Sequence, residues 1–81
     1  MSDAIQDKII SIIQEIKNLA AIDPREALIG NGVLDSFDII NLITALESNF
    51  QITIPGESIV PENLGCVIDI ANLVSAQQSQ Q

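Results

Sequence analysis

The sequence predicts an all-α protein: a four-helix bundle with three main helices, a short third helix and a long first loop. Apolar residues recur three and four positions apart in three stretches, as on one face of an α-helix. One short stretch, Ile52-Thr53-Ile54, alternates like a strand, but three residues without a partner strand form no sheet. With 81 residues, the chain is long enough for one small domain.

The first helix is expected at about residues 4–19. Asp3 and Gln6 have the spacing of a capping box, and apolar residues follow at helical spacing: Ile5, Ile9, Ile12, Ile13, Ile16 and Leu19. Pro24 disfavours helix at the residue before it. Residues 21–35 then form a long connection. Most of this connection should pack onto the bundle, because it contains four large apolar residues, Leu28, Ile29, Val33 and Leu34.

The second helix is expected from about Ser36 to Asn49. One face should belong to the core: Ile39, Leu42, Ile43, Leu46 and Phe50. A second face shares the rim with Ser36: Phe37, Ile40, Thr44, Glu47 and Ser48. Phe37 and Ile40 are large apolar residues, which are a poor choice for a solvated surface. They either cover the long loop or form a recognition patch.

The remaining chain is expected to contain a connector, one short helical turn and a last helix. Ile52 and Ile54 should point inward, and residues 57–60 can form one turn before Pro61. Asn63 is a suitable cap for a last helix at about 64–76, with an inner face of Leu64, Val67, Ile70, Ala71 and Val74. The predicted core of the bundle is Ile9, Ile13, Ile16, Leu42, Leu46, Val67 and Val74.

The predicted domain covers residues 1–76. Residues 77–81 are rich in Gln and Ser, have nothing apolar to bury, and are expected to form a disordered polar tail.

The charge is negative and unevenly distributed. The net charge is −8, and all three basic residues lie before position 26. Such a surface repels nucleic acid and anionic lipid and attracts partners with basic patches, although acids can also serve only to keep a protein in solution. No apolar run is long enough to span a membrane, the start lacks a basic leader, and Cys66 stands alone, as is typical of a reducing compartment. A cytoplasmic monomer is therefore expected.

The sequence gives little support to an enzyme. It contains no histidine, so a hydroxyl nucleophile would lack its most common general base. Zinc would need more than the single Cys66. The acids lack the spacing of a calcium loop, and no glycine-rich phosphate loop is present. Cys66 itself is expected to be a small core or boundary residue.

The segment Asp35-Ser36-Phe37-Asp38 places a serine at a helix start, directly after the loop Gly30-Asn31-Gly32-Val33-Leu34. A helix start has unpaired N–H groups and the positive end of the macrodipole, so it suits a phosphate group. On local grounds alone, a simple helix cap is the better explanation of the Asp-Ser pair. The two roles are compatible, with Asp35 as the cap and Ser36 as an exposed attachment point.

The stretch from Gly32 to Val74 resembles the acyl and peptidyl carrier proteins. The resemblance is carried by Gly32-Val33-Leu34-Asp35-Ser36, Leu42-Ile43-Thr44-Ala45-Leu46-Glu47 with Phe50, Ile52-Thr53-Ile54-Pro55 and Pro61-Glu62-Asn63-Leu64. It implies a bundle of the acyl-carrier-protein type and a covalent 4′-phosphopantetheine cofactor on Ser36, with Asp35 beside it. It also implies a phosphopantetheinyl transferase as partner. Asp35 and Asp38 could then act with that transferase, positioning its magnesium ion and coenzyme A.

The resemblance further implies that the second helix docks onto loading and transfer enzymes with basic patches. The docking residues would be Phe37, Asp38, Ile40, Thr44 and Glu47. Fatty-acid carriers usually have more acids in this helix, whereas here Asn41 and Ser48 are neutral. The favoured interpretation is therefore an acyl carrier for a specialised lipid, polyketide or related pathway. The alternatives are an aminoacyl or peptidyl (D-alanyl-type) carrier, and an unmodified acidic helical adaptor.

Overall fold

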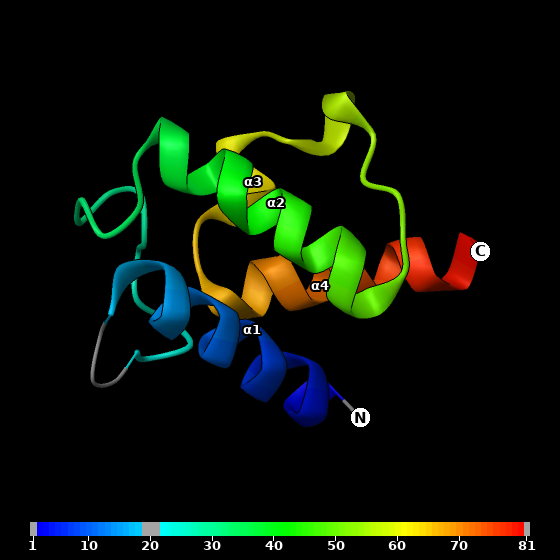
Figure 1. Cartoon of the computed structure of the whole chain (residues 1–81), viewed down its shortest axis with the longest axis horizontal. Helices are drawn as coiled ribbons and strands as arrows, with labels where there is room; N and C mark the ends of the chain where they lie inside the picture. The colour runs from blue at the N-terminus through cyan, green and yellow to red at the C-terminus, as the bar shows by residue number, and fades with distance from the viewer. Residues whose placement is uncertain (1, 19–21, 81) are drawn as a thin grey trace.

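The computed structural model describes residues 2–18 and 22–80 and places four α-helices and one 3-10 turn in them (Figure 1). No strand occurs within these two ranges. The elements are α1 (Ser2–Lys17), α2 (Ser36–Phe50), the 3-10 turn η1 (Gly56–Ser58), α3 (Pro61–Leu64) and α4 (Val67–Gln80). The predicted fold, with three main helices, a short third one and a long first loop, is confirmed.

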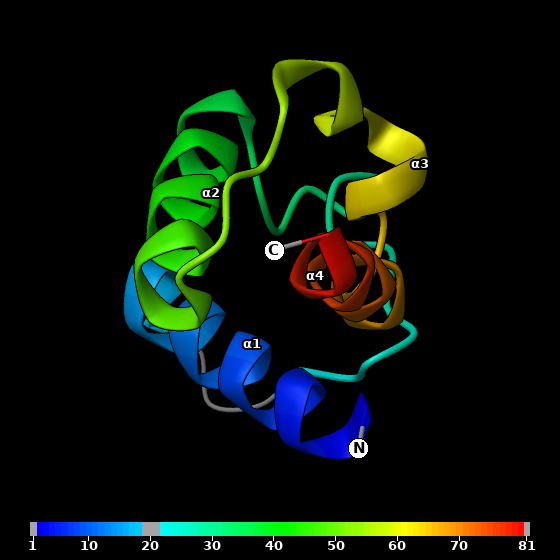
Figure 2. The same ribbon diagram turned by 90° about the vertical axis from the view of Figure 1, so that its right-hand side faces the viewer.

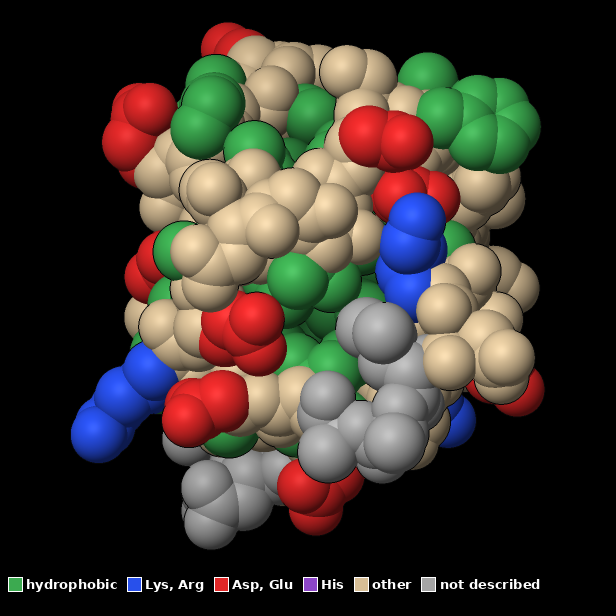
Figure 3. Space-filling view, turned by 90° about the vertical axis from the view of Figure 1, so that its left-hand side faces the viewer, with side chains coloured by type: hydrophobic (Ala, Val, Ile, Leu, Met, Phe, Trp, Pro, Cys, Tyr) green, Lys and Arg blue, Asp and Glu red, His purple; other side chains and the backbone are tan. Residues whose placement is uncertain are grey.

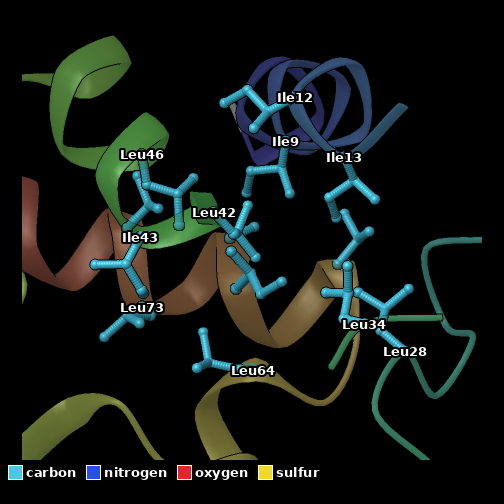
Figure 4. Packing of buried hydrophobic residues seen from close by; sticks show 14 of the residues in the cluster. Ile9, Ile12, Ile13, Leu28, Leu34, Leu42, Ile43, Leu46, Leu64 and Leu73 are labelled. Atoms are coloured by element: carbon cyan, nitrogen blue, oxygen red, sulfur yellow. The ribbon is translucent and has the colours of Figure 1, made fainter. Parts of the chain in front are cut away.

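The three long helices enclose one hydrophobic core (Figure 2). α1 packs against both α2 and α4, and α3 leads into α4. Side chains from all three long helices, from the first loop and from α3 meet in the centre (Figure 4). Of the residues predicted for the core, Ile16, Ile39 and Phe50 are only partly buried. The buried apolar residues are Ile9, Ile12, Ile13, Ile22, Leu28, Leu34, Leu42, Ile43, Leu46, Ile52, Ile54, Leu64, Val67, Ile70, Ala71, Leu73 and Val74.

The first helix is shifted by two residues from its predicted bounds of 4–19. α1 begins at Ser2 and ends at Lys17, and Asn18 has a left-handed backbone (φ 56°), which is a common way to end a helix. Asp3 therefore lies inside α1 and not in front of it. The Asp3 side chain and Leu19 lie outside the described part of the structure, so the pairing of Asp3 with Gln6 stays a prediction.

The long first loop is packed onto the bundle, as its composition predicted. Leu28 and Leu34 are buried, whereas Ile29 reaches the surface. Two backbone hydrogen bonds tie the loop to the junction of α3 and α4: Leu28 N–H donates to Gly65 O (2.8 Å), and Ile68 N–H donates to Pro24 O (3.2 Å). These two bonds fix the loop at Pro24 and Leu28 against this junction.

The segment between α2 and α4 differs from the prediction. The expected turn within residues 57–60 is the 3-10 turn Gly56–Ser58, and the short helix α3 begins only at Pro61. Proline suits the first position of a helix, because its missing N–H would be unpaired there in any case. Asn63 lies inside α3, where its Nδ2 donates to Ser58 O (2.8 Å). The prediction that Asn63 caps the last helix is therefore wrong.

The last helix begins and ends later than predicted. α4 runs from Val67 to Gln80 instead of about 64–76, and its predicted inner face is buried. Gln77 is also buried. Residues 77–80 are thus helical in the structure, although polar composition alone favoured a tail. Residue 81 lies outside the described part, and the domain limits of 1–76 and 77–81 stay a prediction.

We expect Leu46→Ala to lower the free energy of unfolding by about 2–5 kcal/mol, because it removes a fully buried side chain from a small core. The matched control is Ile40→Ala, which truncates an exposed side chain on the same helix and should cost less than about 0.5 kcal/mol. Urea denaturation followed by circular dichroism measures both. Equal stability of the two variants would contradict the core position of Leu46.

Candidate functional site

Ser36 is the first residue of α2, and the cap of this helix is formed by its neighbours. Asp35 Oδ1 accepts the backbone N–H of Asp38 (2.9 Å), and Asp38 Oδ2 accepts the backbone N–H of Asp35 (3.1 Å). This reciprocal pair is a capping box, which satisfies two donors that the helix itself leaves unpaired. Ser36 is exposed, and the described part of the chain contains no hydrogen bond from its hydroxyl. The predicted role of Asp35 as the cap agrees with this geometry, and the role of Ser36 as an attachment point stays a prediction.

The loop before Ser36 is ordered by its own hydrogen bonds. The N–H groups of Val33 and Leu34 both donate to Leu28 O (2.8 and 3.1 Å), and Gly32 N–H donates to Ile29 O (3.0 Å). Gly32 has φ +75°, a left-handed conformation that glycine adopts without the steric cost of a side chain. Ser36 therefore stands at a fixed junction of loop and helix, at the positive end of the α2 dipole.

Asp38 does not lie on the exposed surface that its predicted docking role requires. It is 8% exposed, and its Oδ2 accepts a hydrogen bond from Lys17 Nζ at 2.8 Å, which forms a salt bridge between α1 and α2. The Lys17 ammonium, followed by the Asp35 N–H, lowers the pKa of the Asp38 carboxyl below its ordinary value. The same hydrogen bond raises the pKa of Lys17. Asp38 therefore acts within the fold, where it accepts hydrogen bonds from Lys17 and from the backbone of Asp35.

Glu47 is also engaged within the protein. It is half-buried, and its Oε2 accepts the backbone N–H of Ile54 at 3.0 Å. This bond holds the extended connector against α2, and Ile52 and Ile54 both point inward as predicted. Thr44 is exposed, and its hydroxyl donates to Ile40 O at 3.1 Å.

Two large apolar side chains of α2 lie in the open beside Ser36. Phe37 is 70% exposed and Ile40 is 63% exposed. Neither side chain is buried under the long loop, and a role of the two in recognition stays a prediction. Figure 3 looks onto the end of the molecule that carries the long loop and the start of α2, where hydrophobic side chains reach the surface among acidic ones.

An apolar groove of about 330 Å³ adjoins Ser36. Apart from the Ser36 hydroxyl, the side chains that line it are all apolar: Ile29, Ile39, Ile40, Ile59, Val60, Pro61 and Leu64. The sequence suggests an apolar opening between the second helix and the short third one, and the residues that it singles out on α2 form one side of this groove. The other side of the groove comes from the first loop and from the segment of η1 and α3. The sequence contained one signal for this side: Ile59 and Val60 are apolar but lie in a turn, where no helix face is available to bury them.

A second hollow, of about 370 Å³, offers no comparable chemistry. It is lined by Gln6, Asp23, Pro24, Arg25 and Ile68, and shares no residue with the groove at Ser36. Across residues 2–18 and 22–80, no group of three His, Cys, Asp or Glu side chains could hold a metal ion. Within the same ranges, no helix has both the length and the apolar character needed to cross a membrane.

The fold and the exposed serine at a capped helix start are those expected of a carrier-protein domain. The chain is 34% identical over 77 residues to aminoacyl carrier protein 1 of Bradyrhizobium diazoefficiens, a match that covers 90% of this chain and 84% of that protein. No protein-family model and no solved structure matches the chain. The chain belongs to the acyl and peptidyl carrier protein family.

Acid should destabilise the fold partly through Asp38. Because the pKa of Asp38 is lowered in the folded protein, its contribution is present above its unfolded pKa, at about pH 4, and is lost as the pH falls through the lower folded value. Urea denaturation between pH 2 and 6 should show this loss in the wild type. In Asp38→Asn, the free energy of unfolding should fall less steeply as the pH is lowered. Asp7→Asn, on the exposed side of α1, should keep the pH dependence of the wild type. An identical pH dependence in Asp38→Asn and the wild type would contradict the prediction.

Proposed function

We propose that this carrier protein holds its cargo on a 4′-phosphopantetheine arm joined to the Ser36 hydroxyl through a phosphodiester. The observation that carries the proposal is the free, exposed hydroxyl of Ser36 at the start of a helix whose cap is supplied by Asp35. The positive end of the α2 dipole favours the negative charge of the diester. Ser36 also lines the apolar groove, so an arm attached there has an apolar surface beside it.

The residues of the chain bind and present the arm without catalysing a reaction. When bound, the arm supplies a terminal thiol that holds the cargo as a thioester. The capping box fixes the first turn of α2, and loading and transfer are performed by partner enzymes. We propose that the protein acts in the cytoplasm, where coenzyme A and reduced thiols are available.

The cargo that the groove suits best is an acyl intermediate of a specialised lipid, polyketide or related pathway. Its lining contains no charged side chain, so it favours an apolar group over a cationic one. An aminoacyl cargo is the second candidate, and it is favoured by the name of the relative from Bradyrhizobium diazoefficiens. Mass spectrometry of the arm released from protein purified in its native cells distinguishes an acyl from an aminoacyl thioester.

The surface for partner enzymes is proposed around the exposed side of α2, with Phe37, Ile40 and Thr44. Asp38 and Glu47, which the sequence also suggested, are engaged in internal hydrogen bonds. Two exposed acids, Glu57 in η1 and Glu62 in α3, belong to the segment that forms the other side of the groove. We therefore assign the attraction of a basic partner to these two acids. Phe37 and Ile40 provide the apolar contact.

Ser36→Ala should abolish attachment of the arm. Incubation of the wild type with a phosphopantetheinyl transferase of broad specificity, coenzyme A and Mg²⁺ should add the mass of one arm. Ser36→Ala should remain unmodified, and Ser48→Ala, which changes an exposed serine on the same helix, should be modified like the wild type.

Two results of this mass measurement count against the proposal. Modification of Ser36→Ala would place the arm elsewhere. A wild type that several transferases leave unmodified, while it binds a basic protein partner, would instead support the unmodified adaptor.

Charge and apolar contact at the proposed docking surface should respond differently to salt. Glu57→Lys and Glu62→Lys should each slow modification of Ser36 about threefold at low ionic strength, and the difference should shrink as salt screens the charges. Ile40→Ser should slow it at every salt concentration, because an apolar anchor is not screened. Glu15→Lys makes the same change of charge on an exposed position of α1 and serves as control. Equal effects of Glu15→Lys and Glu62→Lys would show that net charge, and not this surface, governs the rate.

A further inference from the structure

Lys17 connects the end of α1 to the residues that surround Ser36. Its Nζ lies 2.8 Å from Asp38 Oδ2, and the same carboxylate oxygen accepts the backbone N–H of Asp35 at 3.1 Å. Lys17 is therefore one hydrogen bond away from the capping box that begins the helix of Ser36. The view in Figure 3 includes acidic and basic side chains in contact at this end of the molecule.

The positive charge of Lys17 offsets the negative charges that the capping box brings together. The side chains of Asp35 and Asp38 each accept the backbone N–H of the other residue, which places two carboxylates at one helix start, and the Asp38 side chain is only 11% exposed. Two neighbouring carboxylates repel each other, and a carboxylate held away from water is costly without a partner. The Lys17 side chain is 32% exposed. Its attraction to both Asp38 and Asp35 contributes to the raised pKa of its ammonium.

The ion pair also closes the long first loop. α1 ends at Lys17, Asn18 leaves it in the left-handed conformation, and the loop ends at Asp35. The Lys17–Asp38 contact thus joins the two ends of this connection. Closing a loop restricts the positions that its ends can adopt. Here the restricted end is the first turn of α2, which contains Ser36.

We propose that Lys17 is a positioning residue for the modification of Ser36. By holding Asp38 in the capping box, it keeps the first turn of α2 and the Ser36 hydroxyl in the orientation that a phosphopantetheinyl transferase meets. This inference rests on the proposed attachment of the arm to Ser36. Lys17 acts through Asp38 and does not touch the reacting atoms.

A double-mutant cycle tests whether Lys17 acts through Asp38. We compare Lys17→Met, Asp38→Asn and the double variant, because asparagine can still accept the Asp35 N–H but has no charge to pair with Lys17. The measured quantity is kcat/KM for the carrier as substrate of the transferase, at a temperature where circular dichroism shows every variant to be folded. Lys17→Met should lower it about threefold, which is the range of a partly exposed ion pair, and the double variant should lose no more than Asp38→Asn alone.

Two control variants separate positioning from general effects of charge. Lys17→Arg should restore most of the wild-type rate, because a guanidinium can also donate to Asp38. Lys8→Met removes the same charge from an exposed position of α1 and should leave the rate unchanged. Additive losses in the double variant would show that Lys17 acts independently of Asp38, for example by touching the transferase, and would overturn the proposal.

Amide exchange with water, measured by NMR on the unmodified protein, tests the same inference without the transferase. In Lys17→Met, the N–H groups of Asp35 and Asp38 should exchange faster than in the wild type and in Lys8→Met. Unchanged exchange in Lys17→Met overturns the proposal even if the rate of modification falls. If the wild type is not modified at all, the proposed function fails and the role of Lys17 in modification fails with it. The exchange result then still shows whether Lys17 holds the capping box.

Discussion

The reciprocal hydrogen bonds between Asp35 and Asp38 are the constraint on which the functional end of this protein depends. They satisfy donors at the start of α2 with side chains other than that of Ser36, so the serine hydroxyl stays free. They also fix where the helix begins, and hence where its positive dipole end lies. If the Ser36 hydroxyl itself capped the helix, it would be engaged as a hydrogen-bond acceptor and would not be free for attachment of a group. Because these roles are divided between neighbouring residues, Asp35 stabilises the helix start while the Ser36 hydroxyl stays exposed.

The hydrophobic core supplies the support for this arrangement. Leu28 and Leu34 of the long loop are buried in the core, and this anchors the part of the loop that leads into α2. The bond from Leu28 N–H to Gly65 O ties the same loop to the junction that leads into α4. The loop is therefore held both by its buried leucines and by this bond, although residues 22–35 contain no helix or strand. This explains how a connection of its length can present a serine at a defined place.

The acids of this chain fall into two groups with different physical roles. Asp38 and Glu47 accept hydrogen bonds inside the fold, from Lys17 and Asp35 and from the backbone of Ile54 respectively. Other acids, such as Glu62, are exposed at the surface, where we propose that they attract a basic partner. In a chain with a net charge of −8, composition alone does not separate these groups. The distinction matters for function, because charge reversal of an internal acid disturbs the fold, whereas reversal of an exposed acid changes only association.

The sequence by itself determined the all-α class, the three long helices, most of the core and the place of Ser36, because helical periodicity and cap residues are local signals. It did not determine where the last helix begins: Asn63 is a good cap by type, but in the structure it lies inside α3 and bonds to Ser58. The resemblance to carrier proteins also suggested Asp38 as a docking residue, because it is an acid of the second helix. Only the tertiary structure decided that Lys17, 21 positions away, engages that carboxylate, and that α3 completes the groove beside Ser36. Both depend on contacts between segments far apart in the chain, which no local pattern encodes.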